Sequence, residues 1–163
     1  ELGFRQAYAD HDRKLVRDPL DATAVVLLAD LSGEVVGTVR TNVASECDLG
    51  RYAELHRLHA LRGVARSQVT MTSKLIVDAR YRHGRIARQL AHALFRLGVM
   101  CGIVVDFIDC EERLLPLYER LGYRRTSERP FEHPELGPRY PLCLWTNPVY
   151  LRHVGSPFLK GLP

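Results

Sequence analysis

Apolar positions recur along the chain with the two spacings that mark strands and helices. Short apolar or alternating runs bounded by turn residues predict strands at 22–29, 35–43, 68–77, 103–108, 123–125 and 140–145. Apolar positions returning every three or four residues predict helices over 48–61, 86–97 and 115–121, with a weaker helical pattern over 2–16. Two hairpin strands come first and one strand–helix–strand crossover follows, so we expect an α+β fold with a mixed central sheet of about six to seven strands and flanking helices.

Turn residues mark the ends of several segments. An Asp-Pro-Leu-Asp sequence at 18–21 predicts a turn before the first strand, because proline restricts the residue before it and aspartate bonds to nearby backbone groups. Pro116 fits the first position of helix 115–121, and Gly122 fits its left-handed end. No repeat or Gly/Ser linker divides the chain, so residues 1–163 are predicted to form a single domain.

Composition indicates which classes of protein the chain can belong to. With 46% apolar and 26% charged residues, the 163-residue chain does not fit the disordered, collagen-like or coiled-coil classes. No apolar run approaches the roughly 18 residues of a membrane-spanning helix, so we expect no integral membrane segment. The four cysteines lie far apart without a C-x-x-C pair, which favours reduced thiols in a cytoplasmic protein. His56 and His59 have no third ligand at motif spacing, so we expect no metal site.

Basic residues are concentrated in the middle of the chain. The net charge is +4, yet residues 62–88 hold seven basic side chains against one acid. Such a concentration favours phosphates or an acidic partner surface, and the alternative is a solvated helix face. Binding to nucleic acid is a weaker interpretation, because no aromatic stacking platform accompanies the arginines.

Three of these arginines crowd one predicted strand-to-helix turn. Arg82, Arg85 and Arg88 lie where strand 68–77 gives way to helix 86–97. A helix start offers unpaired backbone N–H groups, and guanidinium groups bind phosphate oxygens, so the turn is predicted to hold a phosphate. An ordinary helix start with surface arginines is the alternative.

Two segments resemble the GNAT superfamily of N-acyltransferases. They are the arginine-rich turn and the segment Leu-Leu-Pro-Leu-Tyr-Glu-Arg-Leu-Gly-Tyr at 114–123, which are similar to the acyl-CoA-binding and second signature segments of that superfamily. The resemblance implies the GNAT fold and acyl transfer. Ala87 supplies one small residue expected around a pyrophosphate, but Arg85 stands where a glycine is expected. A bulky side chain there obstructs the close approach of a CoA diphosphate.

A narrower resemblance, to the N-acyl amino acid synthases, extends in order over nearly the whole chain. Its segments are Arg-Asp-Pro-Leu-Asp-Ala-Thr-Ala at 17–24, Val-Gly-Thr-Val-Arg-Thr-Asn at 36–42, Asp-Leu-Gly-Arg-Tyr-Ala-Glu-Leu at 48–55, Thr-Ser-Lys-Leu-Ile-Val at 72–77, Asp-Phe-Ile-Asp-Cys at 106–110 and His-Val-Gly-Ser-Pro-Phe at 153–158. This GNAT-fold branch is related to acyl-homoserine-lactone synthases, and its enzymes move a long fatty acyl group from acyl carrier protein to the α-amine of an amino acid. A carrier protein presents one phosphodiester and an acidic surface, which suits arginines in place of a glycine.

The resemblance implies how the donor would bind. The donor is an acyl-phosphopantetheine thioester on acyl carrier protein, or acyl-CoA, and no cofactor is permanently bound. The implied donor-binding residues are Leu75, Ile76, Val77, Arg82, Gly84, Arg85, Ile86, Ala87 and Arg88. Backbone N–H groups near 75–77, splayed from the neighbouring strand as in the superfamily, hold the thioester carbonyl. The proline-rich stretch 130–141 is predicted to cover the acyl tunnel as a lid. The alternatives are a CoA-dependent N-acetyltransferase and a GNAT-like domain that binds acyl thioesters without catalysis.

Acyl transfer also needs a free amine and a proton for the departing thiolate. Tyr118 stands where GNAT enzymes often keep a tyrosine near the thiol, so it is the predicted acid, and the alternative is a packing role. Glu54, on the polar side of helix 48–61, is the predicted base, and the alternative is a plain surface glutamate.

Two aspartates and two basic residues complete the candidate set. Asp106 and Asp109 lie at the carboxyl end of a strand, where ligands gather in such sheets, so either one is predicted to bind the substrate ammonium or to relay its proton. Asp106 interrupts a core strand, and a buried structural carboxylate is its alternative role. Lys74 and Arg40 are predicted to pair with a carboxylate of the acceptor, a small-molecule amine or amino acid, or with one of these aspartates.

Overall fold

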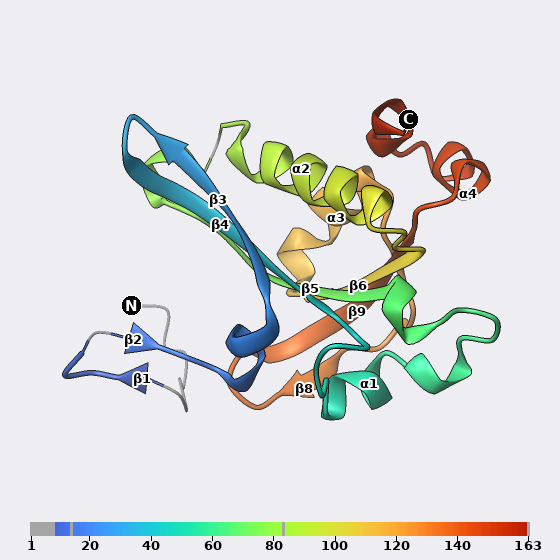
Figure 1. The fold of residues 1–163 in the computed structure, drawn as a ribbon, viewed down its shortest axis with the longest axis horizontal. Helices are drawn as coiled ribbons and strands as arrows, with labels where there is room; N and C mark the ends of the chain where they lie inside the picture. Colours follow the sequence, from blue (N-terminus) through green and yellow to red (C-terminus); the bar gives the residue numbers. More distant parts are fainter. Residues whose placement is uncertain (1–8, 14, 83, 163) are drawn as a thin grey trace.

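A mixed β-sheet forms the centre of the computed structural model, which describes residues 9–13, 15–82 and 84–162 (Figure 1). Its strands are β3 (Val25–Leu31), β4 (Glu34–Val43), β5 (Val69–Val77), β6 (Val105–Cys110), β7 (Arg124–Arg125), β8 (Phe131–His133) and β9 (Gly137–Trp145). The helices are α1 (Arg51–Leu55), α2 (Ile86–Met100), α3 (Leu115–Leu121) and α4 (Pro148–His153). The predicted α+β fold with a mixed sheet and flanking helices is confirmed.

The order of the strands follows the predicted topology. The main path of the sheet is β3-β4-β5-β6-β9-β7, with β8 paired to β9. Strands β3, β4 and β5 are antiparallel neighbours, whereas β5 and β6 are parallel and are joined through α2. The crossover therefore lies at the middle of the sheet, where a parallel pair requires a helical connection.

Two layers of side chains cover opposite faces of the sheet. Since side chains alternate along a strand, Ile108 and Leu142 pack beneath α2, α3 and α4, while Phe107 and Cys143 face α1. Figure 1 shows α2 above the sheet and α1 below it. The sheet thus separates two environments, which are called the α2 face and the α1 face below.

Close approach fixes α2 on the sheet. A Cβ atom added at Gly37 of β4 would lie 3.0 Å from Cγ2 of Ile86 and 3.2 Å from Cδ1 of Leu90. The start of α2 therefore rests directly on the β4 backbone. At the end of α3, Gly122 has a φ of 107°, which confirms the predicted left-handed end of that helix.

Three local predictions are wrong. The helix predicted over 48–61 ends after α1, because Arg57 adopts the left-handed conformation with φ 52° and only a 3-10 turn follows it. The helix predicted over 2–16 falls partly outside the described residues, and its described part forms an antiparallel pair of β1 (Ala9–Asp10) and β2 (Leu15–Val16). The strand predicted over 140–145 begins earlier, because β9 starts at Gly137, where it pairs with β8.

One helix is longer than predicted. Helix α2 continues past Gly98 to Met100, and the backbone turns only at Gly102, which has a φ of 75°. Among the described residues, no helix is both long enough and apolar enough to cross a membrane.

Candidate active site

The two central parallel strands separate partway along their length. Strand β5 pairs with β6 from Val69 opposite Val105 to Met71 opposite Phe107, and no further pairs follow. Its pairing with β4 nevertheless continues to Val77 opposite Gly37. Residues 72–77 therefore stay in the sheet through β4, while their other edge has no strand partner among the described residues. This is the splay predicted near Leu75–Val77, and the stretch where β5 and β6 no longer pair is called the β5–β6 gap below.

A bulge in β5 lies in the same segment. Lys74 has a φ of 50°, and the register between β4 and β5 shifts between Thr38 and Arg40. A left-handed lysine is strained, so surrounding contacts must hold it in place. The bulge interrupts the alternation of side chains, and as a result both Ser73 and Lys74 are directed at the same cluster of charges.

That cluster consists of two carboxylates and two cations on the α1 face. Nη1 of Arg40 lies 2.6 Å from a carboxylate oxygen of both Asp18 and Asp21. Nζ of Lys74 lies 2.9 Å from both carboxylates as well. Arg40 is buried, and its Nε donates a 2.9 Å hydrogen bond to Oγ of Ser73. We call these four charged residues the charge cluster.

The charge cluster keeps its acids ionised. Burial by itself would raise the pKa of Asp21, but hydrogen bonds from Lys74 and Arg40 hold that pKa at about 2. The pKa of Asp18 is lowered in the same way against the effect of its burial. At neutral pH the cluster therefore presents two negative and two positive charges.

The turn at 18–21 builds half of this cluster. The Asp18 side chain accepts a hydrogen bond from the Leu20 backbone N–H, and Asp21 accepts one from the Asp18 N–H. Together they form a capping box on the 3-10 turn Pro19–Thr23. The predicted turn is confirmed, and its carboxylates are the partners of Arg40 and Lys74. Of the two partners predicted for these cations, an acceptor carboxylate or one of Asp106 and Asp109, the second is therefore wrong.

The arginine turn follows directly after β5. Asp78 caps the 3-10 turn Ala79–Tyr81, and Arg80 forms ion pairs with Asp78 and Glu34. Nε of Arg82 donates a 3.1 Å hydrogen bond to the Val77 carbonyl, which holds this guanidinium at the end of β5.

Helix α2 begins at this turn without a side-chain cap. The N-cap residue is Arg85, whose guanidinium has no acceptor for the first backbone N–H groups of the helix. Arg85 and Arg88 are exposed and have no ion pair or hydrogen bond with the side chains of described residues. The features predicted to favour a phosphate are therefore present together.

Other residues assigned to the turn have smaller roles. The side chain of Ile86 packs against β4, so it can offer a ligand its backbone N–H alone. Gly84 is exposed, and an added Cβ there would lie 3.2 Å from the Tyr81 carbonyl oxygen. Ala87 is half-buried in the first turn of α2.

The basic window 62–88 is not one patch in the structure. Lys74 belongs to the charge cluster, Arg80 is paired with acids, and Arg66 donates two hydrogen bonds to the Ala44 carbonyl. These residues are engaged by the protein itself. The arginine turn keeps Arg82, Arg85 and Arg88 beside the gap.

Asp106 lies on the α2 face and is fully surrounded by hydroxyl groups. It accepts hydrogen bonds from Thr70 at 2.7 Å, Thr72 at 2.8 Å and Tyr123 at 2.6 Å. Burial raises its pKa to about 6, and the three hydroxyl groups only partly offset that effect. Asp106 is therefore a carboxylate that titrates near neutral pH.

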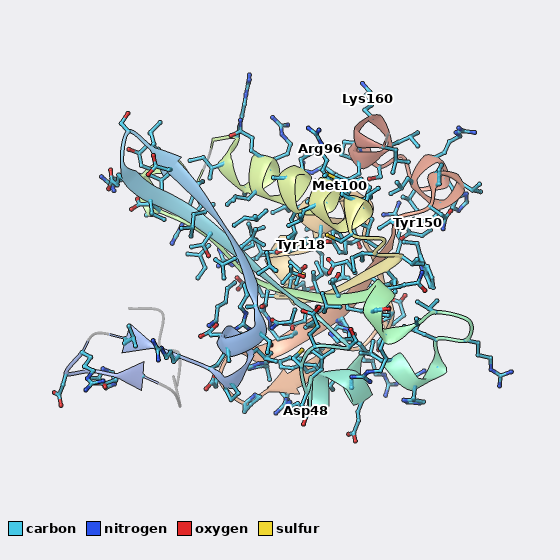
Figure 2. All side chains as sticks on the ribbon, in the orientation of Figure 1. Asp48, Arg96, Met100, Tyr118, Tyr150 and Lys160 are labelled. Atoms are coloured by element: carbon cyan, nitrogen blue, oxygen red, sulfur yellow. The ribbon has the colours of Figure 1, made fainter. Side chains whose placement is uncertain are left out.

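Tyr118 comes close to this group through Tyr123. The rings of Tyr118 and Tyr123 meet edge to face with centroids 5.7 Å apart. Burial raises the pKa of Tyr118 above its ordinary value, so its hydroxyl stays protonated. Figure 2 shows Tyr118 between the sheet and α2, on the side of the sheet opposite Asp48. The structure thus brings together two predicted catalytic residues, Tyr118 and Asp106.

Asp109 points to the other face of the sheet. Its carboxylate accepts a 2.7 Å hydrogen bond from Nε of Arg139, and both side chains are largely buried. Residues three apart on a strand face opposite sides, so Asp106 and Asp109 do not form one site. Glu54 is exposed on α1 and makes no hydrogen bond or ion pair with the other candidate residues.

Comparisons with known proteins identify the family. The family model for the N-acyl amino acid synthase FeeM matches residues 4–146. The chain belongs to the FeeM family of N-acyl amino acid synthases. It is accordingly an acyltransferase enzyme, which removes the alternative of a non-catalytic domain. A comparison with curated proteins finds no match.

Solved structures show that the fold of this FeeM-family chain is the GNAT fold. FeeM from uncultured soil microbes superposes with a TM-score of 0.66 at 13% identity, covering 86% of this chain and 76% of that one. The CoA-dependent acyl-homoserine lactone synthase BjaI, solved with SAM and isopentyl-CoA, has a TM-score of 0.67 at 21% identity, covering 94% and 74%. The aminoglycoside acetyltransferase AAC(6')-Ib, solved with coenzyme A, has a TM-score of 0.58 at 19% identity, covering 82% and 72%.

Sequence reasoning missed part of the site in this family member. The sequence predicts a turn at Asp18 and Asp21 and no role for their carboxylates. The signal is two acids three positions apart beside a proline, which is typical of a capped turn with both carboxylates on one side. The ring pair of Tyr52 and His133, joined by a 2.7 Å hydrogen bond, links α1 to β8 across 81 positions and has no local signal. Within the described ranges, no three His, Cys, Asp or Glu side chains gather in a way that would hold a metal ion.

Proposed function

We propose that this synthase transfers a long-chain fatty acyl group from the thioester of an acyl carrier protein to the α-amine of an amino acid or a similar amine, in the cytoplasm. The observation that carries the proposal is the position of the β5–β6 gap directly before the arginine turn. A thioester in the gap and a phosphate at the turn are then two parts of one extended ligand.

The proposed donor site combines these two features. Residues 72–77 have backbone groups without a strand partner on the β6 side, so those N–H groups near Leu75, Ile76 and Val77 that point to this side are available to a thioester carbonyl. The phosphate of phosphopantetheine lies at the uncapped start of α2, where Arg82, Arg85 and Arg88 supply positive charge.

Carrier protein is favoured over CoA by the side chains at the helix start. Arg85 occupies the N-cap position with an exposed, unpaired guanidinium, and Arg88 follows one turn later. Figure 2 shows Arg96 farther along α2, pointing outward. An acidic carrier surface complements this line of arginines, and one phosphodiester needs less space than a nucleotide diphosphate.

The charge cluster is the proposed acceptor site. An amino acid is a zwitterion, and the cluster offers carboxylates for its ammonium together with Arg40 and Lys74 for its carboxylate. Lys74 directly precedes residues 75–77, which are proposed to hold the thioester carbonyl. The acceptor is therefore held on the α1 face beside the carbonyl to be attacked.

The proposed chemistry is direct transfer. Glu54 takes a proton from the ammonium, and the free amine attacks the thioester carbonyl to form a C–N bond. The oxyanion is stabilised by N–H groups near 75–77, the C–S bond then breaks, and Tyr118 donates its proton to the thiolate. The second proton of the attacking nitrogen restores neutral Tyr118, which leaves the amide, the free thiol and protonated Glu54. Because its oxygens contact three hydroxyl groups, Asp106 is proposed to act on Tyr123 beside Tyr118 and Asp109 to act through Arg139, in place of direct contact with the ammonium.

A donor panel tests the proposal. The chain is incubated with hexadecanoyl carrier protein, hexadecanoyl-CoA or acetyl-CoA and a mixture of amino acids, and the products are identified by mass spectrometry. We expect N-hexadecanoyl amino acids, formed about tenfold faster from the carrier protein than from hexadecanoyl-CoA. Turnover with acetyl-CoA alone would eliminate long-chain transfer. With the donor known, Glu54→Gln should lower kcat, and an unchanged kcat would remove Glu54 from the mechanism.

Long-chain acyl-CoA is the second candidate donor. The BjaI structure is described as CoA-dependent and contains isopentyl-CoA, and it shares the fold of this chain. Faster turnover of hexadecanoyl-CoA than of hexadecanoyl carrier protein would establish this alternative and leave the rest of the proposed mechanism unchanged.

A further inference from the structure

A buried histidine on the α1 face has both ring nitrogens unsatisfied. His56 is 4% exposed, and neither Nδ1 nor Nε2 has a hydrogen-bond partner among the described residues. Its ring packs against Phe107 with centroids 5.2 Å apart. Buried polar groups in native proteins are nearly always paired, so an imidazole with two free nitrogens needs an explanation.

The neighbouring histidine shows what a satisfied ring looks like here. His133 also faces α1, and its Nδ1 accepts hydrogen bonds from the backbone N–H groups of Glu135 and Leu136. Its Nε2 lies 2.7 Å from the Tyr52 hydroxyl. His133 is therefore a structural residue with every ring nitrogen engaged, and His56 is not.

The free imidazole of His56 lines a pocket of about 410 Å³. The sheet supplies Phe107, Cys143 and Trp145 as its floor, and the residues following α1 together with the β7–β8 segment supply mostly apolar walls. Such a volume falls within the range of ligand pockets in proteins. Thr126 and Ser127 also line the pocket, and a mostly apolar cavity with a few polar groups is the common design of a small-molecule site.

Two arginines lie at the mouth of the pocket. Arg57 and Arg129 both line it, and both are exposed, without an ion pair to a described side chain. Arg57 is held there by its left-handed backbone, which turns the chain at the end of α1. Positive charge at the mouth favours a ligand with an anionic end.

The pocket lies apart from the donor site. None of its lining residues belongs to the gap segment 72–77, the arginine turn or the charge cluster. The stretch 130–141, predicted to be a lid over an acyl tunnel, contributes Pro130, Phe131 and Pro141 to this pocket. This stretch therefore forms part of the wall of the His56 pocket on the α1 face.

We propose that the His56 pocket binds an amphiphilic carboxylate that carries a hydroxyl or keto group in its apolar body. The apolar body fills the space over Phe107 and Trp145, the hydroxyl or keto oxygen hydrogen-bonds with His56, and the carboxylate lies between Arg57 and Arg129. A free carboxylate distinguishes this ligand from the acyl thioester donor.

The chemistry of the imidazole fits a neutral partner. Burial lowers the pKa of His56 to about 4, so the ring is uncharged at neutral pH and presents one N–H donor and one nitrogen acceptor. A hydroxyl group can use either nitrogen, and a keto oxygen can use the donor. The carboxylate stays at the mouth with the arginines because its desolvation beside a neutral ring is unfavourable.

Binding by calorimetry tests the proposal without any turnover, so its outcome is independent of the acyl transfer proposed above. The probes are decanoate, 3-hydroxydecanoate, 10-hydroxydecanoate and the methyl ester of the tighter hydroxy acid. We expect one hydroxy acid to bind about tenfold more tightly than decanoate, and the methyl ester to bind about tenfold more weakly than its acid. Equal binding of all four probes, or no binding, would overturn the proposal.

Matched variants locate the contact. His56→Phe keeps an aromatic ring and is expected to remove the preference for the hydroxy acid while leaving decanoate binding unchanged. His59→Phe, at an exposed histidine of the same segment that does not line the pocket, should keep the preference. Loss of the preference in both variants, or in neither, would contradict the proposal.

A measurement on the unmodified chain covers the case in which His56→Phe does not fold. In ¹⁵N-histidine NMR spectra, the hydroxy acid should shift the ring nitrogens of His56 and leave those of His133 in place. Shifts confined to other histidines would place the ligand elsewhere and overturn the proposal.

Discussion

The two faces of the sheet hold their aspartates in opposite ways. On the α1 face, Asp18 and Asp21 have cationic partners, and the pKa of Asp21 falls to about 2. On the α2 face, Asp106 has hydroxyl partners alone, and its pKa rises to about 6. The pKa values of two aspartates on opposite faces of one sheet, Asp21 and Asp106, therefore differ by several units.

The difference shows that the chemistry of its partners decides whether the pKa of an aspartate is lowered or raised. Cations stabilise the ionised carboxylate through charge, and hydroxyl groups supply hydrogen bonds without repaying the loss of solvation. The α1 face thus offers fixed charges that suit a zwitterionic acceptor. The α2 face offers a group that can gain or lose a proton near neutral pH, next to Tyr118 and the proposed donor.

Removing a cation from the α1 face should have the largest effect. Arg40→Met leaves Lys74 as the cation of the cluster for Asp18 and Asp21, and an incompletely paired, partly buried charge costs about 3 kcal/mol of unfolding free energy. Chemical denaturation at pH 7 measures the loss. Arg80→Met is the control, because Arg80 pairs with acids at an exposed position, and its unfolding free energy should change little. Equal losses in the two variants would show that the charge cluster stabilises the fold no more than an exposed ion pair does.

Removing the hydroxyl of Tyr118 should impair catalysis while leaving the fold intact. Tyr118→Phe is expected to lower kcat about 100-fold with little change in KM, because it removes the proposed proton donor to the thiolate. Steady-state assays with the active donor measure both constants. Tyr140→Phe, at another half-buried tyrosine packed on the same core, is the control. An equal fall in kcat for both variants would assign Tyr118 a packing role.

The pH dependence of stability should separate the two faces. Folded Asp106 binds its proton more tightly than the unfolded chain does, so its contribution is full below pH 4 and is lost as pH rises through about 6, amounting to roughly 2–3 kcal/mol. Asp106→Asn should remove this slope. Asp21 acts in the opposite direction, since its lowered pKa makes stability fall as pH drops from about 4 toward 2.

Thermal unfolding across pH 2–8 measures both effects. The Asp21→Asn variant should lose the acid-side slope and keep the slope between pH 4 and 6. A single slope shared by both variants would show that the two carboxylates do not differ as the structure indicates.

The smallest expected effect concerns the donor end of α2. Arg85→Gln should raise KM for the carrier-bound donor about tenfold without changing kcat, because it removes one charge-assisted contact to phosphate. Arg120→Gln, at an exposed arginine of α3, is the matched control and should leave KM unchanged. A change of equal size in the control would show a general charge effect in place of a phosphate site.

Elements with local signals were predictable from the sequence. Helix α3 has the predicted bounds because Pro116 fits its start and Gly122 its left-handed end. The period of two along β6 is the sequence signal that places Asp106 and Asp109 on opposite sides of the sheet, as their hydrogen-bond partners show.

Features that depend on distant contacts were not predictable. The left-handed conformations of Arg57 and Lys74 follow from tertiary packing, and they end α1 early and create the bulge in β5. The partners of Asp18 lie 22 positions away at Arg40 and still farther along the chain at Lys74. No local pattern encodes such pairings, so the charge cluster required the structure.

Hydrogen exchange tests the donor site most directly. The ligand is an acylated pantetheine 4′-phosphate in which a ketone replaces the thioester, so that it cannot react. The account predicts slower amide exchange in 72–78 and at the start of α2, with no change in α1. Protection confined to α1 and β8, with the β5–β6 gap unaffected, would contradict it.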